Sequence, residues 1–263
     1  MTRTVLCILL TALLSACAPT RRGSALADTW IASPNHGPRE PNLVVLHYTT
    51  NDDAETAIRT LIDPRREVSA HYLIGRDGRI YQLVDELRRA WHAGAAYWGG
   101  MRDINSASIG IELDNSGHEP FPPDQIEALL ALLADLQTRY DIPTANFIGH
   151  SDVALGRKVD PGVLFPWRTL AAQGFGRWCD PPYPAVPPEF SLDTALHALG
   201  YDTADPDAAR RAFRLHYLAE FDELGAAALE ADLAHCLLHR TCIASDPANA
   251  GRCRKPEPGQ IRQ

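Results

Sequence analysis

Positive charge is scarce in this 263-residue chain, and lysine is nearly absent from it. Lys158 and Lys255 are its only two lysines, and 33 acidic residues against 25 Lys and Arg give a formal net charge of −8. Nucleic-acid-binding domains carry a basic face, so the composition argues against a nucleic-acid partner. The composition does not exclude neutral or zwitterionic polymers as partners. Because Lys158 is not drawn from an abundant surface population, a specific role for it is favoured.

The apolar run VLCILLTALL near the N-terminus is too short to span a bilayer. Arg3 precedes it and the small residues of LSAC follow it, which predicts a signal peptide over residues 1–16. LSAC resembles the lipobox of bacterial lipoproteins. We therefore expect an acylated Cys17 that holds the protein on the periplasmic face of the outer membrane of a Gram-negative bacterium. The alternative, an ordinary signal with an incidental cysteine, predicts a soluble periplasmic protein.

Two common metal-binding patterns are missing from the chain. No HExxH motif occurs, which excludes a ligand pair on one helix face. No CxxC pair occurs, which disfavours a zinc site built from thiolates. Six cysteines become four once Cys7 leaves with the signal peptide and Cys17 is acylated. The four that remain are Cys179, Cys236, Cys242 and Cys253. In an oxidising compartment they allow three disulfide pairings, and the sequence does not choose among these.

The hydrophobic pattern divides the mature chain into segments. Residues 17–40 are rich in Ser, Pro, Gly and Arg and predict a tether. Over residues 41–176, strand patterns such as NLVVLHYTT and SASIGIEL alternate with helical ones such as PPDQIEALLALLADLQTRY, and AHYLIGRDGRIYQLV predicts a hairpin. This order predicts an α/β fold with a mixed central β-sheet flanked by helices. A Pro-rich linker (177–188), a small three-helix domain (189–242) and a polar tail (243–263) follow.

Two histidines and one aspartate form the strongest candidate for a metal site. His47 and His150 each end a predicted buried strand. Asp160 follows in a loop, and the Pro-Gly pair after it favours an ordered turn. Two imidazoles and a carboxylate, with water in the fourth position, are a common arrangement for catalytic zinc. The chain has 10 histidines, however, and a histidine beside a strand is more often a hydrogen-bonded core or surface group. By residue type alone, His71 and His92 are equal candidates.

Six motifs occur here in the order that they take in one enzyme family: VVLHYT, SAHYLIGRDGRIYQLV, AWHAG, NSASIGIEL, FIGHSDVALGRKVDPG and FPW. Over about residues 42–175 the chain therefore resembles the zinc-dependent N-acetylmuramoyl-L-alanine amidases. This family, also called the amidase-2 group, shares its fold with peptidoglycan recognition proteins. The later segments TALHALGY and AARRAFRLHYL resemble, more weakly, a peptidoglycan-binding helical domain. A structural appendage is the alternative for that domain.

The resemblance implies a role for each matching residue. His47, His150 and Asp160 match the ligands of one zinc ion, Glu112 matches the general base, and Lys158 matches the residue that steadies the developing oxyanion. The implied reaction is hydrolysis of the amide between N-acetylmuramic acid and L-Ala of the stem peptide, with peptidoglycan and its muropeptides as partners. Two alternatives remain open, a peptidoglycan-binding module without activity and a zinc peptidase that acts within the stem peptide.

Other residues near these motifs are candidates for the substrate groove or for orienting the ligands. Asp152 either supports His150 or simply terminates the strand before it. For the aromatic candidates, ordinary packing is the alternative to a place in the groove. The groove candidates are Tyr48, His71, Trp91, His92, Trp98 and Asn105.

Overall fold

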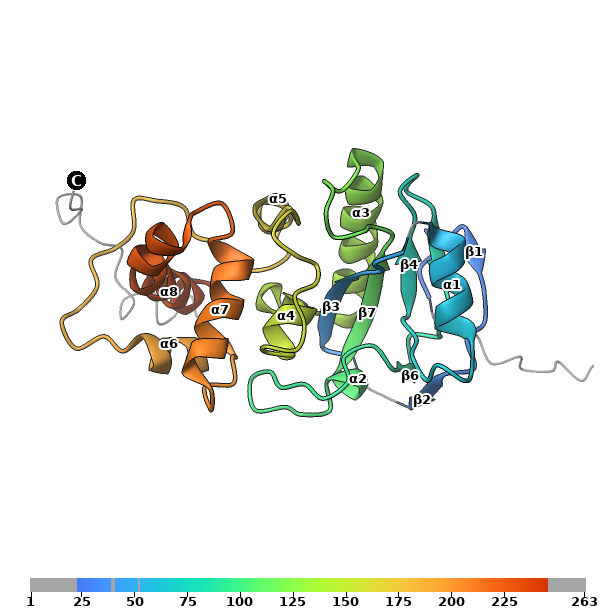
Figure 1. Ribbon diagram of the computed structural model, residues 1–263, viewed down its shortest axis with the longest axis horizontal. Helices are drawn as coiled ribbons and strands as arrows, with labels where there is room; N and C mark the ends of the chain where they lie inside the picture. Colours follow the sequence, from blue (N-terminus) through green and yellow to red (C-terminus); the bar gives the residue numbers. More distant parts are fainter. Residues whose placement is uncertain (1–22, 39–40, 52, 246–263) are drawn as a thin grey trace, which may run out of the picture.

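The computed structural model describes residues 23–38, 41–51 and 53–245, and its centre is a six-stranded mixed sheet (Figure 1). Strands in the middle of the sheet pair in parallel, and the hairpin strand next to them pairs antiparallel. This confirms the predicted fold class. From edge to edge the strands are β1 (Thr29–Trp30), β5 (Ile80–Gln82), β4 (Tyr72–Ile74), β7 (Ser108–Leu113), β3 (Leu43–Tyr48) and β8 (Phe147–Gly149).

The middle strands are buried along almost their whole length. The sequences LVVLHY of β3 and SIGIEL of β7 are the near-continuous apolar runs expected of parallel strands that are covered on both faces. The antiparallel β4 and β5 form the predicted hairpin, whose turn contains Gly78. Gly78 has a φ of 78°, a left-handed conformation that glycine adopts without a steric penalty. The hairpin prediction is therefore confirmed.

Alternation along β3 and β7 separates the two faces of the sheet. Val44 and Ile111 belong to the core cluster that packs against the long helix α3 (Pro123–Tyr140). Because successive side chains of a strand point to opposite faces, His47 and Glu112 emerge on the face that α3 leaves uncovered. The two-residue alternation that places apolar side chains in the core thus directs His47 and Glu112 to the opposite face.

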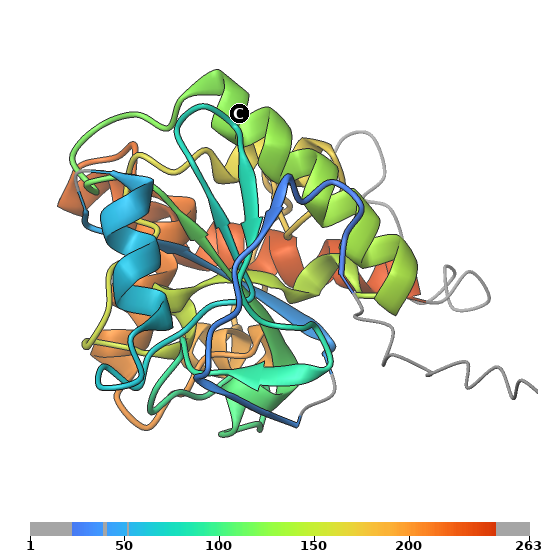
Figure 2. The ribbon, with the colours of Figure 1, turned by 90° about the vertical axis from the view of Figure 1, so that its right-hand side faces the viewer.

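Helix α1 (Ala54–Ile62) packs on the sheet from the side opposite α3 (Figures 1 and 2). It begins at Asp53, whose side chain accepts a hydrogen bond of 2.7 Å from the backbone N–H of Thr56, a favourable N-cap. Its buried residues Ala57, Ile58 and Leu61 pack against Leu73 of β4 and Leu83, which follows β5. The remaining helices of this domain are short: α2 (Ile104–Ala107), the 3-10 helix η1 (Thr144–Asn146), α4 (His150–Val153) and α5 (Trp167–Ala172).

The segment expected to be a tether differs from the prediction. Strand β1 pairs with β5, and β2 (His36–Pro38) pairs with β6 (Arg88–Ala90) in a separate two-stranded sheet. Ser33 and Asn35 are buried between these strands, and Asn35 donates hydrogen bonds to two backbone carbonyls. The prediction of a tether up to residue 40 is thus wrong from residue 29 to residue 38. The signal peptide and Cys17 lie outside the described residues.

Three helices form the C-terminal part, as predicted: α6 (Leu192–Leu199), α7 (Pro206–Tyr217) and α8 (Glu223–Ser245). A disulfide between Cys179 and Cys236 ties the Pro-rich linker to α8, with Cα atoms 6.2 Å apart. This settles one of the pairings that the sequence left open. The side chains of Cys242 and Cys253 lie outside the described residues.

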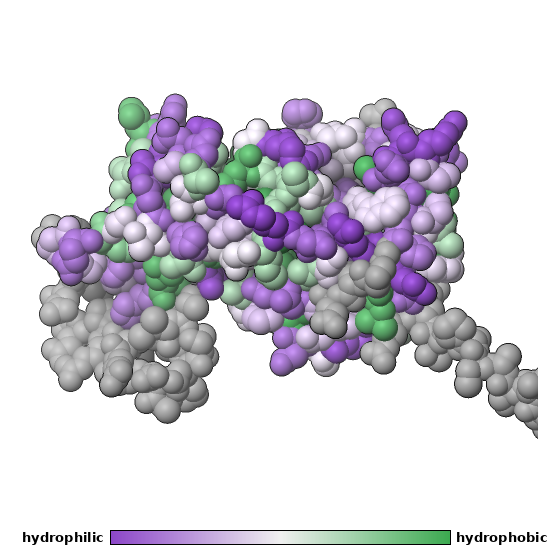
Figure 3. Space-filling view, turned by 90° about the horizontal axis from the view of Figure 1, so that it is seen from below, coloured by the Kyte–Doolittle hydropathy of each residue, from purple (hydrophilic) through white to green (hydrophobic). Residues whose placement is uncertain are grey.

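Among the described residues, the helical domain shares its core with the α/β domain. One continuous apolar cluster joins Leu43 and Val45 of β3, through α4, to Leu196 and Phe213 of the helices. On the face drawn in Figure 3, hydrophilic residues predominate and apolar residues form small separate patches. Within the part of the chain that the structure describes, no helix is long and apolar enough to cross a membrane.

Candidate metal centre

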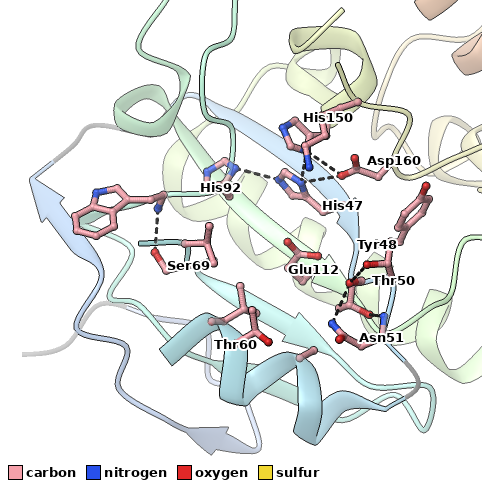
Figure 4. Close-up of a pocket in the computed structure, with 16 residues that line it drawn as sticks. His47, Tyr48, Thr50, Asn51, Thr60, Ser69, His92, Glu112, His150 and Asp160 are labelled. Carbon is pink, nitrogen blue, oxygen red and sulfur yellow. Dashed lines mark hydrogen bonds and ion pairs between the residues drawn. The ribbon is translucent and has the colours of Figure 1, made fainter. Parts of the chain in front are cut away.

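Parallel pairing of β3 and β7 brings the first two site residues together. His47 and Glu112 are direct partners in the register, so their side chains leave the sheet side by side on the same face (Figure 4). Adjacent strands lie about 4.8 Å apart, so this pairing fixes the separation of the imidazole and the carboxylate. Two residues that are 65 positions apart in the sequence are thus neighbours because of strand register alone.

His150 and Asp160 come from the segment that follows β8. His150 is the first residue of α4 and not the last residue of the strand, which ends at Gly149. The backbone N–H of Ser151 donates a hydrogen bond of 2.9 Å to the carbonyl of Asp160, which closes the loop between the two residues. The loop thereby folds back so that both side chains face His47 (Figure 4).

Three potential ligand atoms meet at one point. Nδ1 of His47 lies 3.0 Å from Nδ1 of His150 and 3.0 Å from Oδ2 of Asp160, and the last two atoms are 2.9 Å apart. All three residues are buried. Zinc–nitrogen bonds of about 2.0–2.1 Å would place ligand atoms about 3.3–3.4 Å apart in a tetrahedral site, so the triangle needs to open only slightly to hold an ion.

Hydrogen bonds on the far side of each ring decide where its proton lies. Nε2 of His150 lies 3.1 Å from the carbonyl of Ala93, which can only accept, so Nε2 carries the proton and Nδ1 has a free lone pair. For His47, Nε2 lies 3.0 Å from Nδ1 of His92. His92 Nε2 in turn lies 3.1 Å from the hydroxyl of Ser108, and that hydroxyl donates to the carbonyl of Ile104 at 2.6 Å.

This chain of hydrogen bonds runs in one direction. The Ile104 carbonyl requires the Ser108 proton, so Ser108 accepts from His92, His92 accepts from His47, and Nδ1 of His47 is left unprotonated. Two lone pairs and a carboxylate oxygen then face one another at about 3 Å with no proton between them. Acceptor atoms placed in this way repel one another unless a cation lies between them, so these residues fit a metal ion.

Burial supports the neutral state of His47. Desolvation, aided by the nearby His150, lowers the pKa of His47 from 6.5 to about 4. The contact between His47 and Asp160 is therefore not an ion pair at neutral pH, although the two atoms are 3.0 Å apart. A neutral imidazole is the form that binds a metal.

The three residues lie in a pocket of about 220 Å³ that also contains Glu112 and Lys158. Oε2 of Glu112 is buried and has no hydrogen-bond partner among the described residues. Desolvation and the charge of Asp160 raise the pKa of Glu112 well above its ordinary value, while the charge of Lys158 opposes this rise. A carboxylate in this state is a strong candidate for a proton acceptor.

The groove candidates separate into three groups. Tyr48, Trp91 and His92 line the pocket, and His92 also supports His47 as described above. Asn105 borders an adjoining recess, where its side-chain oxygen accepts hydrogen bonds from the backbone N–H groups of His92 and Ala93. The neighbouring loop is held in place by these bonds.

His71 and Trp98 line neither the pocket nor the recess, so their placement in the groove was wrong. His71 instead lies edge-on to His92, the residue that supports His47, with ring centres 5.9 Å apart. His71 is fully buried, and its Nδ1 accepts a hydrogen bond from the backbone N–H of Gly110. Trp98 is buried in the contact with the helical domain, where it packs edge-on against Tyr201 with ring centres 5.0 Å apart. Both side chains are fixed by tertiary contacts that the sequence pattern does not encode.

Some residues of the site were not predicted. Ser108 and Gly110 precede Glu112 on the same face of β7, and a Cβ on Gly110 would lie 2.5 Å from the ring of His92. Their signal was present in the sequence, because small residues at alternate positions of SIGIEL indicate that something packs closely there. Other unpredicted residues that line the pocket are Thr49, Thr50, Asn51, Ala57, Thr60, Leu61, Val68 and Ser69.

This chain is similar in sequence to a known protein family and to several characterised enzymes. Residues 37–163 match the family model described as N-acetylmuramoyl-L-alanine amidase. The chain is 39% identical over 208 residues to the N-acetylmuramoyl-L-alanine amidase AmiD of Escherichia coli, which covers 66% of this chain and 74% of AmiD. It is 37% identical over 163 residues to the 1,6-anhydro-N-acetylmuramyl-L-alanine amidase AmpD of Enterobacter cloacae, covering 54% of this chain and 87% of AmpD.

Solved structures agree with these matches. The fold is similar to that of E. coli AmiD in complex with the substrate anhydro-N-acetylmuramic acid-L-Ala-D-gamma-Glu-L-Lys, with a TM-score of 0.65, 34% identity, and coverage of 84% of this chain and 93% of AmiD. It is also similar to AmpDh3 from Pseudomonas aeruginosa, with a TM-score of 0.69, 29% identity, and coverage of 87% and 99%. This chain therefore belongs to the N-acetylmuramoyl-L-alanine amidase family.

Proposed function

We propose that this protein is a zinc-dependent hydrolase of peptidoglycan. It would cleave the amide between the lactyl group of N-acetylmuramic acid and L-Ala of the stem peptide. The observation that carries this proposal is the meeting of two imidazole nitrogens and a carboxylate oxygen within about 3 Å, in the pocket that also holds Glu112 and Lys158. Membership of the amidase family supports the choice of bond.

His47, His150 and Asp160 would hold one zinc ion through Nδ1, Nδ1 and Oδ2. Zinc bound there would supply a Lewis acid that makes water more acidic and polarises the carbonyl of the amide. The hydrogen bonds to His92 and to the Ala93 carbonyl hold the two rings in orientation and in the binding tautomer.

Glu112 is placed to move the proton in the reaction. Its carboxylate would accept a proton from the attacking water and deliver it to the amide nitrogen as the carbon–nitrogen bond breaks. Burial raises the pKa of Glu112, and a more basic carboxylate is a better acceptor for the proton of the attacking water. Lys158 would stabilise the negative charge that develops on the carbonyl oxygen.

The surroundings of the pocket fit a sugar-peptide substrate. Trp91 lines both the pocket and the adjoining recess, and it offers an apolar ring between them. The recess also contains Arg157 and Lys158, together with Arg89, which is paired with Asp103 at 3.0 Å, against one acidic residue, Glu67. This excess of positive charge matches the carboxylates of a stem peptide. The partner that we propose is therefore peptidoglycan or its muropeptide fragments, with no nucleic acid.

The same proposal covers the place of action. A periplasmic site, with attachment to the outer membrane through an acylated Cys17, would bring the enzyme to its polymer. Cys17 and the signal peptide support this through their sequence pattern only, because they lie outside the described residues. The helical domain would add contacts with the wall polymer.

The products of muropeptide digestion test the proposed function. We expect mass spectrometry to find free N-acetylmuramic-acid-containing sugars and intact stem peptides that begin with L-Ala. Trimmed stem peptides that stay attached to the sugar would instead identify a peptidase. Unchanged muropeptides that co-sediment with the protein would identify a binding module. A zinc chelator should stop the reaction, and added zinc should restore it.

Replacing Lys158 by Met should lower kcat by about 10²–10³-fold, the usual cost of removing one group that stabilises an oxyanion. The pH profile provides a second readout. The charge of Lys158 lowers the pKa of Glu112, so its removal raises that pKa and moves the acidic limb of kcat/KM to higher pH. Arg211→Met is a matched control, since it removes an exposed cation of α7 that lines neither the pocket nor the recess. Equal activity of the two variants would contradict the role of Lys158.

A further inference from the structure

Asp152 is a fully buried carboxylate next to the metal centre that the proposed reaction does not use. Both of its oxygens are engaged. Oδ2 accepts hydrogen bonds of 2.7 Å from the backbone N–H of Gly149 and 2.7 Å from Nδ1 of His216, and Oδ1 accepts one of 2.8 Å from the hydroxyl of Tyr201. The first partner belongs to the amidase domain and the other two belong to the helical domain.

The two partners from the helical domain are held firmly. The ring of His216, on α7, stacks on Trp167 with centres 3.9 Å apart and on Tyr217 with centres 4.0 Å apart. Nε2 of His216 is buried without a hydrogen-bond partner among the described residues, so the bond to Asp152 is the polar contact that orients the ring. Tyr201, which follows α6, is likewise buried.

Asp152 in turn holds the turn that presents the metal ligands. Its bond to the Gly149 N–H closes the first turn of α4, which begins at His150. Gly149 is packed closely by its neighbours, because a Cβ there would lie 2.9 Å from Pro161 and 3.1 Å from Trp167. The Ser151 N–H bond to the Asp160 carbonyl then links the same turn to the second ligand. One short segment thus carries the positions of both ligands.

We propose that His216 and Tyr201 are positioning residues for the metal centre. They hold Asp152, Asp152 holds the turn from Gly149 to His150, and the affinity for zinc depends on that turn. The helical domain is then part of the catalytic unit as well as a neighbour of it. This inference rests on the proposed function, because it assumes that His150 and Asp160 bind a catalytic ion.

Two substitutions of His216 in the full chain separate the hydrogen bond from the packing. His216→Asn keeps an N–H donor near the position of Nδ1 but loses the aromatic stack. His216→Phe keeps the stack but loses the donor. We expect the Phe variant to weaken zinc binding by about tenfold or more, and the Asn variant to stay within about threefold of the wild type, as for other residues that support a metal ligand.

Tyr201→Phe provides a second test that removes only one oxygen atom. We expect zinc affinity to fall in this variant but not in Tyr217→Phe, its matched control. Tyr217 is a buried tyrosine of the same interface, and its hydroxyl makes no hydrogen bond within the described part of the chain. In zinc-saturated protein, kcat of the Tyr201 variant should fall while KM changes by less than about twofold, because the turn that carries His150 is displaced and the residues that would bind substrate are untouched.

Zinc affinity is measured by competition with a chromophoric chelator, without substrate, and folding is checked by circular dichroism. Wild-type affinity in both His216→Phe and Tyr201→Phe would overturn the proposal. An Asn variant that loses affinity while the Phe variant keeps that of the wild type would overturn it too, because packing alone would then be responsible. If His216→Phe fails to fold, the comparison of Tyr201→Phe with Tyr217→Phe decides. A chain that binds zinc but releases no sugar from muropeptides would refute only the proposed function.

Discussion

Replacing Glu112 by Gln should reduce kcat by about 10²–10⁴-fold, the range that general acid–base catalysis contributes, while zinc stays bound. Gln has the same shape as Glu but cannot accept a proton from water. The three metal ligands are untouched, so the zinc content should equal that of the wild type. Release of sugar from muropeptides and metal analysis of the purified protein measure the two effects together.

The same substitution should stabilise the metal-free protein. The pKa of Glu112 is raised in the folded state, so its charge opposes folding, and stability is lost as the pH rises through that folded pKa. A neutral Gln removes this loss. The gain in the free energy of unfolding should therefore be larger at pH 8 than at pH 5, and a urea titration at each pH measures it.

Glu127→Gln is the matched control for Glu112→Gln, because Glu127 is exposed on α3, away from the pocket. It should leave both turnover and stability unchanged. Full turnover by the Glu112 variant would remove this residue from the mechanism. A loss of zinc together with turnover would instead assign it a structural role at the metal.

Part of the centre could be predicted from the residues alone, because His47 occurs where a continuous apolar strand begins to carry polar residues. Glu112 was predicted from the resemblance of SIGIEL to the family motif, and the structure adds that parallel pairing makes it a neighbour of His47. Lys158 could be placed beside Asp160, because side chains two residues apart in extended backbone point the same way. Both line the pocket. These are local or periodic features, which a single sequence displays.

The parts that were missed depend on contacts between distant segments. Strands β1 and β2 are two and three residues long and have no apolar alternation, and they exist because β5 and β6 offer free edges. Trp98 was assigned to the groove because it is aromatic, but Tyr201 and Gly200 of the helical domain cover it. The sequence suggested two roles for Asp152, and only the fold revealed that α7 supplies one of its partners.

Replacing Asp160 by Asn should abolish zinc-dependent turnover and stabilisation by zinc, with little change in the stability of the metal-free protein. The substitution removes the one negative charge among the three ligand atoms, so we expect affinity for zinc to fall by more than about 100-fold, beyond the 10–100-fold cost of losing a residue that only supports a ligand. Turnover at a fixed zinc concentration should fall with occupancy. The side-chain amide can donate to Nδ1 of His47 or His150, which removes the repulsion among acceptors in the metal-free state.

Thermal unfolding with and without zinc gives the sharpest measurement of this effect. An ion present at about 100 times its dissociation constant stabilises the folded state by about 2.7 kcal/mol. In a domain of this size, that corresponds to a rise in Tm of roughly 5–10 °C. The wild type and the control Asp232→Asn, whose carboxylate lies on α8 away from the pocket, should show this rise, and Asp160→Asn should not. An equal rise in all three proteins would mean that the ion binds elsewhere, and the assignment of Asp160 as a ligand would be withdrawn.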